Sequence, residues 1–185
     1  MYKIIVRDKG TACDHDAVEV HNPSYMLSIQ DFGDEPVSTP KFIKPENHMH
    51  IFFDDLDIAD AGKRISARYS DKIRARCPTR FDVQSILDFG KRIPDGSTLF
   101  MHCFAGIARS TASAYALYAQ QLKAGEEWLA FKEMVKGSIA PWPNDLIVQI
   151  ADDLLGRNGQ LFKTFDDWRE RKRIYWKLAG ISSLD

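Results

Sequence analysis

The stretch His102-Cys103-Phe104-Ala105-Gly106-Ile107-Ala108-Arg109-Ser110 decides how this chain is built. The apolar run before it, residues 98–101, predicts a buried strand, and the alanine-rich, proline-free run after it, residues 110–124, predicts a helix. Cys103 therefore lies where a strand ends, and Arg109 lies where a helix begins. A short loop in front of a helix N-terminus directs backbone N–H groups toward an anion.

The residue types in this loop predict phosphoryl transfer. The positive end of a helix stabilises a thiolate relative to a thiol, which makes Cys103 a candidate nucleophile at neutral pH. The planar guanidinium of Arg109 can grip two oxygens of a phosphate group. A tetrahedral dianion held over a thiolate favours transfer of the phosphoryl group to sulfur. We expect the phosphate-binding groups to come from Phe104, Ala105, Gly106, Ile107, Ala108 and Arg109.

This stretch resembles the signature of the cysteine-dependent protein tyrosine phosphatases: His-Cys, five residues, Arg, then Ser or Thr. It matches at every fixed position, and the resemblance extends over about residues 25–155. Rhodanese-type sulfurtransferases also place a loop between Cys and Arg, but their loop is usually shorter, so the spacing here favours phosphate over sulfur transfer. The resemblance implies a phosphocysteine intermediate and a reaction that needs neither a metal ion nor a cofactor. It also implies that Ser110 helps the cysteine sulfur to leave during hydrolysis.

Composition limits the other classes of function. A chain of 185 residues, 44% hydrophobic and 28% charged, fits one domain with a substantial core. The net charge of −1 gives no general attraction to nucleic acid or membranes, and no apolar run approaches the ~20 residues of a membrane span. Residues 1–6 lack a signal-peptide pattern. Three widely spaced cysteines, Cys13, Cys77 and Cys103, argue against a disulfide framework and favour a reducing compartment, so we expect the cytoplasm.

Hydrophobic patterning predicts an α/β protein. The predicted strands cover residues 4–6, 25–29, 48–53 and 98–101, and the predicted helices begin near Thr79 and cover 110–124, 126–136 and 145–155. This order predicts a mixed, largely parallel sheet flanked by helices. The resemblance implies the three-layer arrangement of a tyrosine phosphatase. We expect a phosphatase domain over residues 1–156. Residues 157–185 would form a C-terminal extension, helical around residues 166–178, packed on the same domain.

The general acid should come from the end of another strand. Catalytic groups of parallel sheets gather beyond the carboxyl ends of the strands, where the chain carries Asp54, Asp55 and Asp57. Compact, dual-specificity-like members of the family often spell this acid Phe-x-Asp. Phe53-Asp54-Asp55 matches that spelling, so Asp55 is our choice, with Asp57 and Asp54 as alternatives. No Trp-Pro-Asp loop precedes Cys103. The sequence Trp142-Pro143-Asn144 follows the nucleophile and lacks the acid, and we assign Pro143-Asn144 a structural role.

Several substrates remain open at the level of the sequence. The resemblance implies protein phosphotyrosine, with dual specificity as a variant, and inorganic phosphate or sulfate should bind in the loop. Phosphoinositide phosphatases usually carry lysines inside the loop, whereas Phe104, Ala105, Ile107 and Ala108 are apolar. An RNA 5′-phosphate is an alternative, because the segment Ile58–Arg80 is basic. That segment is either the solvated face of an amphipathic helix or a flap that attracts acidic substrates. A non-catalytic phosphate-binding module is the rival from another class.

Overall fold

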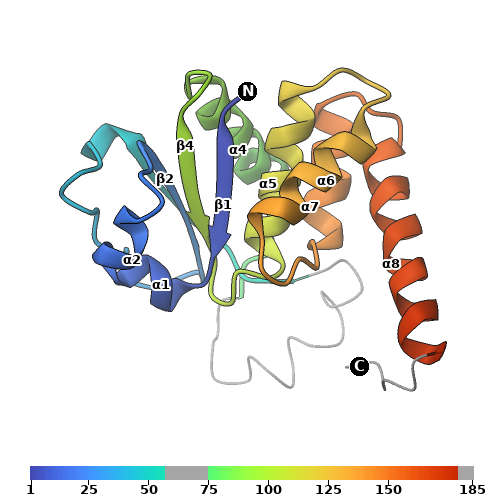
Figure 1. Ribbon diagram of the computed structural model, residues 1–185, viewed down its shortest axis with the longest axis horizontal. Coiled ribbons are helices and arrows are strands. Elements are labelled where there is room, and N and C mark those ends of the chain that lie inside the picture. Colours follow the sequence, from blue (N-terminus) through green and yellow to red (C-terminus); the bar gives the residue numbers. More distant parts are fainter. Residues whose placement is uncertain (57–74, 179–185) are drawn as a thin grey trace.

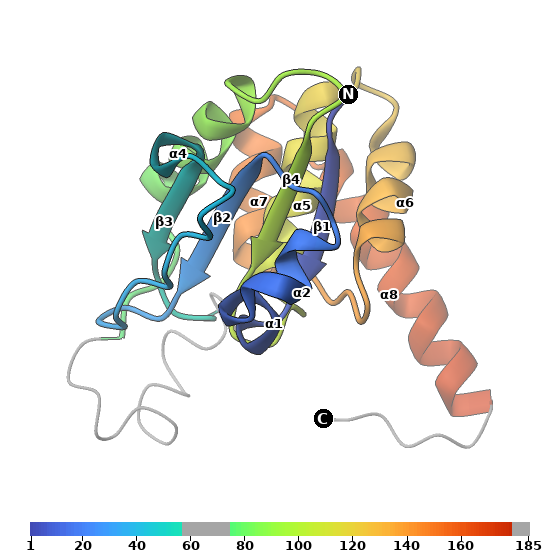
Figure 2. The ribbon, with the colours of Figure 1, turned by 60° about the vertical axis from the view of Figure 1, so that its left-hand side comes forward.

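The computed structural model describes residues 1–56 and 75–178. Its centre is a four-stranded sheet in the order β1-β4-β2-β3. Figure 1 labels β1, β4 and β2, and Figure 2 labels β3 beside β2 as well. Every pair of neighbouring strands is parallel. The strands are β1 (Lys3–Arg7), β2 (Tyr25–Gln30), β3 (His48–Phe52) and β4 (Thr98–His102).

The helices connect the strands on both faces of the sheet. Two short helices, α1 and α2, link β1 to β2, and α4 links the 75–79 segment to β4. Longer helices, α5 to α8, follow β4 in the described part of the chain (Figure 2). The bounds are α1 (Lys9–Cys13), α2 (His15–Glu19), α4 (Arg80–Lys91), α5 (Arg109–Gln121), α6 (Glu127–Gly137), α7 (Asp145–Leu154) and α8 (Gln160–Leu178), with a 3-10 turn at Pro45–Asn47.

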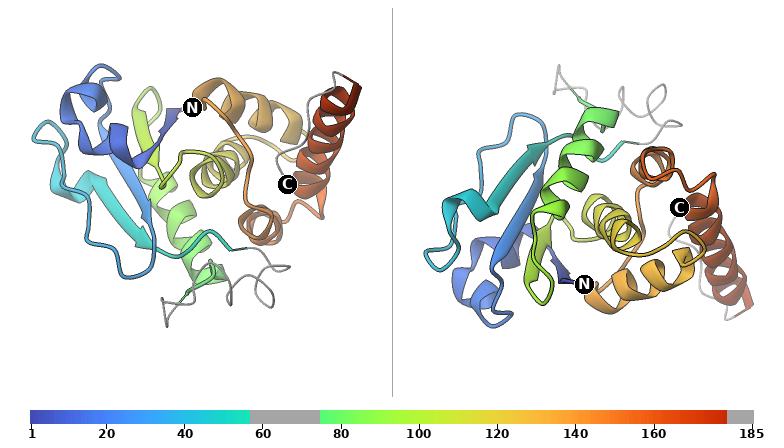
Figure 3. Two further views of the ribbon diagram at one scale, coloured as in Figure 1. Left: turned by 90° about the horizontal axis from the view of Figure 1, so that it is seen from below. Right: turned by 90° about the horizontal axis from the view of Figure 1, so that it is seen from above.

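The sheet separates two apolar clusters, which makes three layers. Alternate residues of a strand point to opposite faces, and in β1 Ile4 and Val6 join the larger cluster while Ile5 joins the smaller one. The larger cluster lies under α4–α8, and the smaller one lies under α1, α2 and the 31–44 loop. Figure 3 shows α1 and α2 on one side of the sheet and α4–α8 on the other. Because both faces are covered, the strands are largely buried rather than alternating between buried and exposed positions, and the buried set includes the polar side chains of Ser28, His48 and His102.

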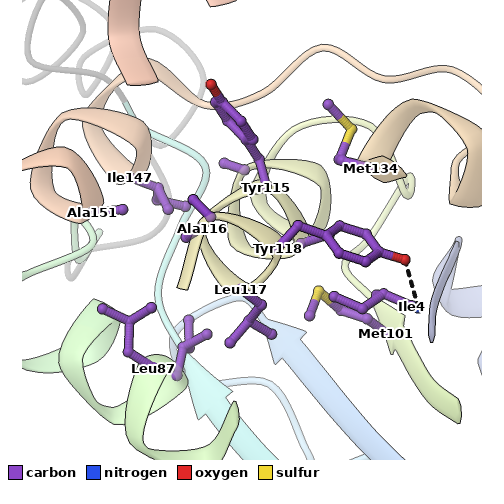
Figure 4. Packing of buried hydrophobic residues seen from close by; sticks show 14 of the residues in the cluster. Ile4, Leu87, Met101, Tyr115, Ala116, Leu117, Tyr118, Met134, Ile147 and Ala151 are labelled. Atoms are coloured by element: carbon purple, nitrogen blue, oxygen red, sulfur yellow. Dashed lines mark hydrogen bonds between the residues drawn. The ribbon is translucent and has the colours of Figure 1, made fainter. Parts of the chain in front are cut away.

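Helix α5 lies at the centre of the larger apolar cluster. All its residues from Arg109 to Ala119 are buried. Figure 4 shows its side chains reaching α4, α6, α7 and the sheet, with the Tyr118 hydroxyl accepting a hydrogen bond of 2.9 Å from the Ile4 N–H. The helix that follows the predicted nucleophile is therefore fixed by contacts on every side.

The predicted fold class is confirmed, and the described strands show no antiparallel pairing. Helix α4 starts where it is predicted to, just after Thr79, which forms a capping box with Asp82, and Asn144 caps α7 by accepting from the Ile147 N–H. Helix α5 ends at Gln121 rather than at 124, because Leu122 adopts extended backbone. The terminal helix begins at Gln160, earlier than the patterning predicts, and packs Phe165 into the larger cluster.

Part of the basic segment, residues 58–74, lies outside the described residues, as do 179–185. In the described part, Arg76 Nη2 donates hydrogen bonds to both carboxylate oxygens of Asp82, at 2.8 and 3.0 Å. This arginine therefore anchors the chain at the start of α4. Across residues 1–56 and 75–178, none of the helices combines the length and apolar character that a membrane span requires.

Candidate active site

The loop between β4 and α5 is held from outside by its carbonyl groups. Backbone N–H groups of three other residues donate to these carbonyls: Lys9 to Phe104 at 3.0 Å, Trp142 to Ile107 at 3.0 Å and Asn144 to Ala108 at 3.2 Å. The chain contains no cis peptide bond among the described residues. In a trans peptide the N–H points away from the carbonyl. The N–H groups that follow these carbonyls therefore point away from the outside donors, the arrangement that anion binding within the loop requires.

Gly106 allows the loop to lie against the end of β1. Its φ is +69°, in the left-handed region, and a Cβ here would meet the Arg7 carbonyl carbon at 2.6 Å and the Asp8 nitrogen at 2.9 Å. Both are backbone atoms, so a larger residue has no simple way to fit. This close approach explains a glycine at the centre of the loop.

Cys103 and Ser110 meet at the base of the loop. Cys103 Sγ and Ser110 Oγ are 3.1 Å apart, and both residues are buried. Ser110 is the second residue of α5, so the loop returns its hydroxyl to the sulfur. This is the contact that a hydroxyl assisting sulfur departure would make.

Arg109 is held on one side of its guanidinium. Its Nη1 donates to the Phe53 carbonyl at 2.7 Å and forms an ion pair of 2.8 Å with Asp31 Oδ1. Its Nε is buried and finds no hydrogen-bond partner among the described residues. A buried donor without a partner is costly unless a ligand satisfies it. The arginine is therefore positioned with an unused donor, which suits an oxyanion.

Asn144 connects the predicted acid loop to the loop of residues 103–109, which is called the phosphate loop below for its predicted role. Its side-chain amide donates to Asp55 Oδ1 at 3.0 Å and to the Leu56 carbonyl at 3.3 Å. Its backbone N–H donates to the Ala108 carbonyl in the phosphate loop. Asn144 therefore links Asp55 to the phosphate loop through these contacts. The side chain of Asp55 is exposed.

Asp54 faces a different environment from Asp55. It is buried, and its Oδ2 accepts a 2.7 Å hydrogen bond from the Arg76 N–H, while its own N–H donates to the Arg76 carbonyl. One of its carboxyl oxygens thus joins β3 to the segment before α4, while Oδ1 is buried and has no hydrogen-bond partner among the described residues. The remaining alternative, Asp57, lies outside the described residues.

Sequence patterning does not single out Asp31, which follows the last residue of β2. It forms the ion pair with Arg109, although the patterning places it only in a loop that ends a strand. The signal that could have identified Asp31 is its position directly after β2, because β2 lies beside β4 in the sheet. Carboxyl ends of adjacent parallel strands meet at one edge.

His102 lies under the loop rather than in it. It is fully buried, and its Nδ1 lies 3.2 Å from the Cys103 carbonyl oxygen. Burial lowers the pKa of His102 to about 4. The neutral, buried ring of His102 is therefore suited to hydrogen bonding with its neighbours rather than to carrying a charge. Among the described residues, no three His, Cys, Asp or Glu side chains come together in a way that could hold a metal ion.

Solved structures share this architecture. A PTP-2 phosphatase from Cydia pomonella is 18% identical, with a TM-score of 0.54 over 82% of this chain and 84% of its own. DUSP15 is also 18% identical, with a TM-score of 0.51 over 92% of this chain and 93% of its own. Tk-PTP in its active form is 13% identical, with a TM-score of 0.50 over 85% and 94% of the two chains.

Comparison of sequences gives no relative. No protein-family model matches the chain, and the search of curated proteins gives no match. The likeness therefore rests on the parallel sheet, its helical layers and their order along the chain. The protein has the fold of the cysteine-dependent protein tyrosine and dual-specificity phosphatases.

Proposed function

We propose that this protein is a phosphomonoester hydrolase that works through a phosphocysteine at Cys103. The observation that carries the proposal is the state of Arg109, whose Nη1 is fixed by Phe53 and Asp31 while its buried Nε lacks a partner among the described residues. The loop beside it directs N–H groups inward. An anion seated there would satisfy both sets of donors over the Cys103 sulfur.

Four side chains can divide the chemistry between them. The Cys103 thiolate attacks phosphorus, the ester P–O bond breaks, and Asp55 gives its proton to the leaving oxygen. Water then attacks the phosphocysteine, the Asp55 carboxylate takes a proton from that water, and the P–S bond breaks. Ser110 donates a hydrogen bond to the departing sulfur, and Arg109 holds the phosphoryl oxygens through both steps.

Protein phosphotyrosine is the substrate that the loop fits best. Two side chains of the loop expose apolar surface beside the phosphate position, since Phe104 is 67% and Ile107 39% exposed. An aromatic ring attached to the phosphate could pack on this surface, whereas a polyphosphorylated inositol would find no lysine within the loop. Dual specificity is a variant of the same proposal.

The nucleophile is tested with para-nitrophenyl phosphate. The wild-type protein should turn over this substrate at full rate in the presence of a chelator, with a phosphocysteine trapped by rapid acid quench. Cys103→Ser should reduce kcat to background but still bind inorganic phosphate, because the loop donors and Arg109 remain. Arg109→Ala should lose both turnover and phosphate binding.

Cys77→Ser is the matched control, because Cys77 is a free, half-buried cysteine. It should retain wild-type activity. Appreciable turnover by Cys103→Ser, or turnover that appears only with added divalent metal, would contradict the mechanism. Phosphate binding with no turnover by the wild-type protein would instead favour the non-catalytic module.

The substrate class is tested with four phosphate esters at matched concentration: a phosphotyrosine peptide, a phosphoserine peptide, a phosphoinositide and an RNA 5′-phosphate. The highest kcat/KM is expected for the phosphotyrosine peptide. Phe104→Ser should reduce that value while leaving inorganic phosphate binding unchanged. A preference for another ester would overturn the substrate assignment but not the phosphocysteine mechanism.

A further inference from the structure

A line of hydrogen-bonded side chains runs beneath the phosphate loop and across the sheet. Starting from the Cys103 carbonyl, it passes through His102 Nδ1 at 3.2 Å, and His102 Nε2 reaches Ser28 Oγ at 2.7 Å. Ser28 Oγ then meets His48 Nε2 at 2.7 Å, and His48 Nδ1 meets Thr39 Oγ1 at 2.8 Å. The line thus crosses β4, β2 and β3 and ends in the 31–44 loop. Ser28, His48 and His102 are buried.

The Cys103 carbonyl, at which the line begins, fixes the direction of the first two hydrogen bonds. A carbonyl oxygen can only accept, so His102 Nδ1 must carry a hydrogen. Burial lowers the pKa of His102 to about 4, so near neutral pH the ring holds one proton and Nε2 is bare. The Ser28 hydroxyl must therefore donate to His102 Nε2.

The remaining two bonds follow from the single hydrogen of a hydroxyl group. Ser28 has already used its hydrogen, so His48 Nε2 must donate to Ser28 Oγ. Burial, with His50 and His102 nearby, lowers the pKa of His48 to about 3, so this ring is also neutral and its Nδ1 is bare. Thr39 therefore donates to His48. Every donor along the line points toward Cys103, an arrangement in which each hydrogen bond polarises the next.

We propose that Ser28 and His48 are positioning residues for the phosphate loop, which hold His102 as the tautomer that pins the Cys103 carbonyl. The pinned carbonyl belongs to the peptide that carries the Phe104 N–H. Because this peptide is trans, anchoring its oxygen beneath the loop aims that N–H in the opposite direction, toward the anion. The inference rests on the proposed function for its purpose, but the hydrogen-bond order can be measured without turnover.

The first test reads the tautomer of His102 directly, from the nitrogen chemical shifts of its ring in ¹⁵N-labelled protein near pH 7. In the wild type, Nδ1 should be the protonated nitrogen. Ser28→Ala removes the donor to Nε2 and leaves only the Cys103 carbonyl to select the Nδ1-protonated form, so a measurable fraction of the Nε2-protonated form should appear. Ser113→Ala is the matched control, because Ser113 is a fully buried serine whose hydroxyl has no hydrogen-bond partner among the described residues.

The second test reads the loop, through alkylation of Cys103 by iodoacetamide at pH 6 and through protection by inorganic phosphate. Ser28→Ala should slow alkylation about fivefold and raise the phosphate concentration needed for half-protection by a similar factor. His48→Phe, which removes the donor to Ser28, should act in the same way. His48→Gln keeps an amide donor at that place and should recover most of the wild-type behaviour.

The outcomes separate the inference from the proposed function. An unchanged His102 tautomer together with a Cys103 alkylation rate within twofold of wild type, in either Ser28→Ala or His48→Phe, would overturn the inference. Should Ser28→Ala fail to fold, the contrast between His48→Phe and His48→Gln decides. The expected tautomer change in a protein that hydrolyses no phosphate ester would leave the hydrogen-bond order standing and remove the proposed function.

Discussion

Asp54 and Asp55 are neighbours in sequence, but their side chains meet different surroundings. Asp54 is buried against the Arg76 backbone, whereas Asp55 is exposed and is held beside the phosphate loop by Asn144. The same substitution at the two positions should therefore change different properties of the protein.

Asp55→Asn should slow phosphotyrosine hydrolysis by roughly 10²–10⁴-fold, because the leaving oxygen loses its proton donor. The loss should be much smaller with an aryl phosphate whose phenolate is already stable. Steady-state kinetics on the two substrates, with a pH–rate profile, measures this difference. A leaving-group-dependent loss in Asp57→Asn but not in Asp55→Asn would place the acid two positions further along the chain.

Asp54→Asn should instead lower the free energy of unfolding, by about 1–3 kcal/mol, because a buried amide replaces the carboxyl group that accepts the Arg76 N–H. Its kcat should stay near the wild-type value for both substrates. Urea denaturation measures the first effect. A strong rate loss without a change in stability would move Asp54 into the chemistry.

Gly106→Ala should abolish phosphate binding by moving the loop. The new Cβ would lie under 3.0 Å from backbone atoms of Arg7 and Asp8, and the left-handed φ adds strain. Gly96 is a matched control, since its φ is +79° but a Cβ at this position would meet nothing within 4 Å. Gly96→Ala should cost some stability and leave phosphate affinity intact. Isothermal titration with inorganic phosphate compares the two variants.

At the scale of the elements, the buried histidines of β3 and β4 make the stability of the sheet depend on pH. Burial lowers the pKa of His102 from 6.5 to about 4 and that of His48 from 6.5 to about 3. Below pH 6.5 the unfolded chain binds protons that the folded chain excludes, so stability is full above pH 6.5 and falls as the pH drops toward these folded values.

The free energy of unfolding should therefore fall between about pH 6.5 and 5, by up to about 1.4 kcal/mol per pH unit for each histidine. Denaturant titrations across this window measure the slope, which precedes most carboxylate protonation. His48→Gln removes one of the two titrating rings and should give a shallower slope. A flat profile in the wild type would mean that the rings are protonated in the folded state.

Helices α5, α6 and α7 are joined at one end by Arg157. Its guanidinium forms a 3.0 Å ion pair with Glu127 and donates to the carbonyls of Ala119 and Leu122. Both members of the pair are only 7% exposed. The end of α5 far from the phosphate loop is therefore fixed by a buried charge.

Arg157→Met should destabilise the protein by about 3–5 kcal/mol, because it leaves the Glu127 carboxylate buried without a cation. Lys91→Met, which breaks an exposed pair with Asp88, should cost less than about 1 kcal/mol. Thermal and urea unfolding measure both. Adding Glu127→Gln to Arg157→Met should restore part of the loss, and failure to do so would show that the carbonyl contacts dominate.

The sequence predicts well those elements that are determined by residues close to one another in the chain. The strands appear within a residue or two of the predicted ranges because apolar runs bury both faces, and Thr79 and Asn144 cap their helices through neighbours three positions on. Helices α1 and α2 escape prediction because each spans one short stretch without periodic apolar residues. Asp8 and Asp14 cap them, and those two residues are the signal that could have found them.

The residues of the candidate site also fall into those that the sequence predicts and those that it does not. Cys103, Arg109 and Ser110 share one contiguous stretch, so their spacing indicates their chemistry. The contact of Asp31 with Arg109 and that of Asn144 with Asp55 join residues far apart in the chain. Such pairs depend on the order of the strands, which hydrophobic patterning alone does not reveal.

At the scale of the whole molecule, the order of the strands has a consequence for how the chain is made. The first strand, β1, pairs with β4, whose residues begin at Thr98. During synthesis the N-terminal strand must wait for about half of the chain before its neighbour exists. Pairings so distant in sequence slow folding and leave strand edges exposed meanwhile. The loop at Gly106 follows β4 directly and rests on Arg7 and Asp8, so this loop and the complete sheet should form in the same folding step.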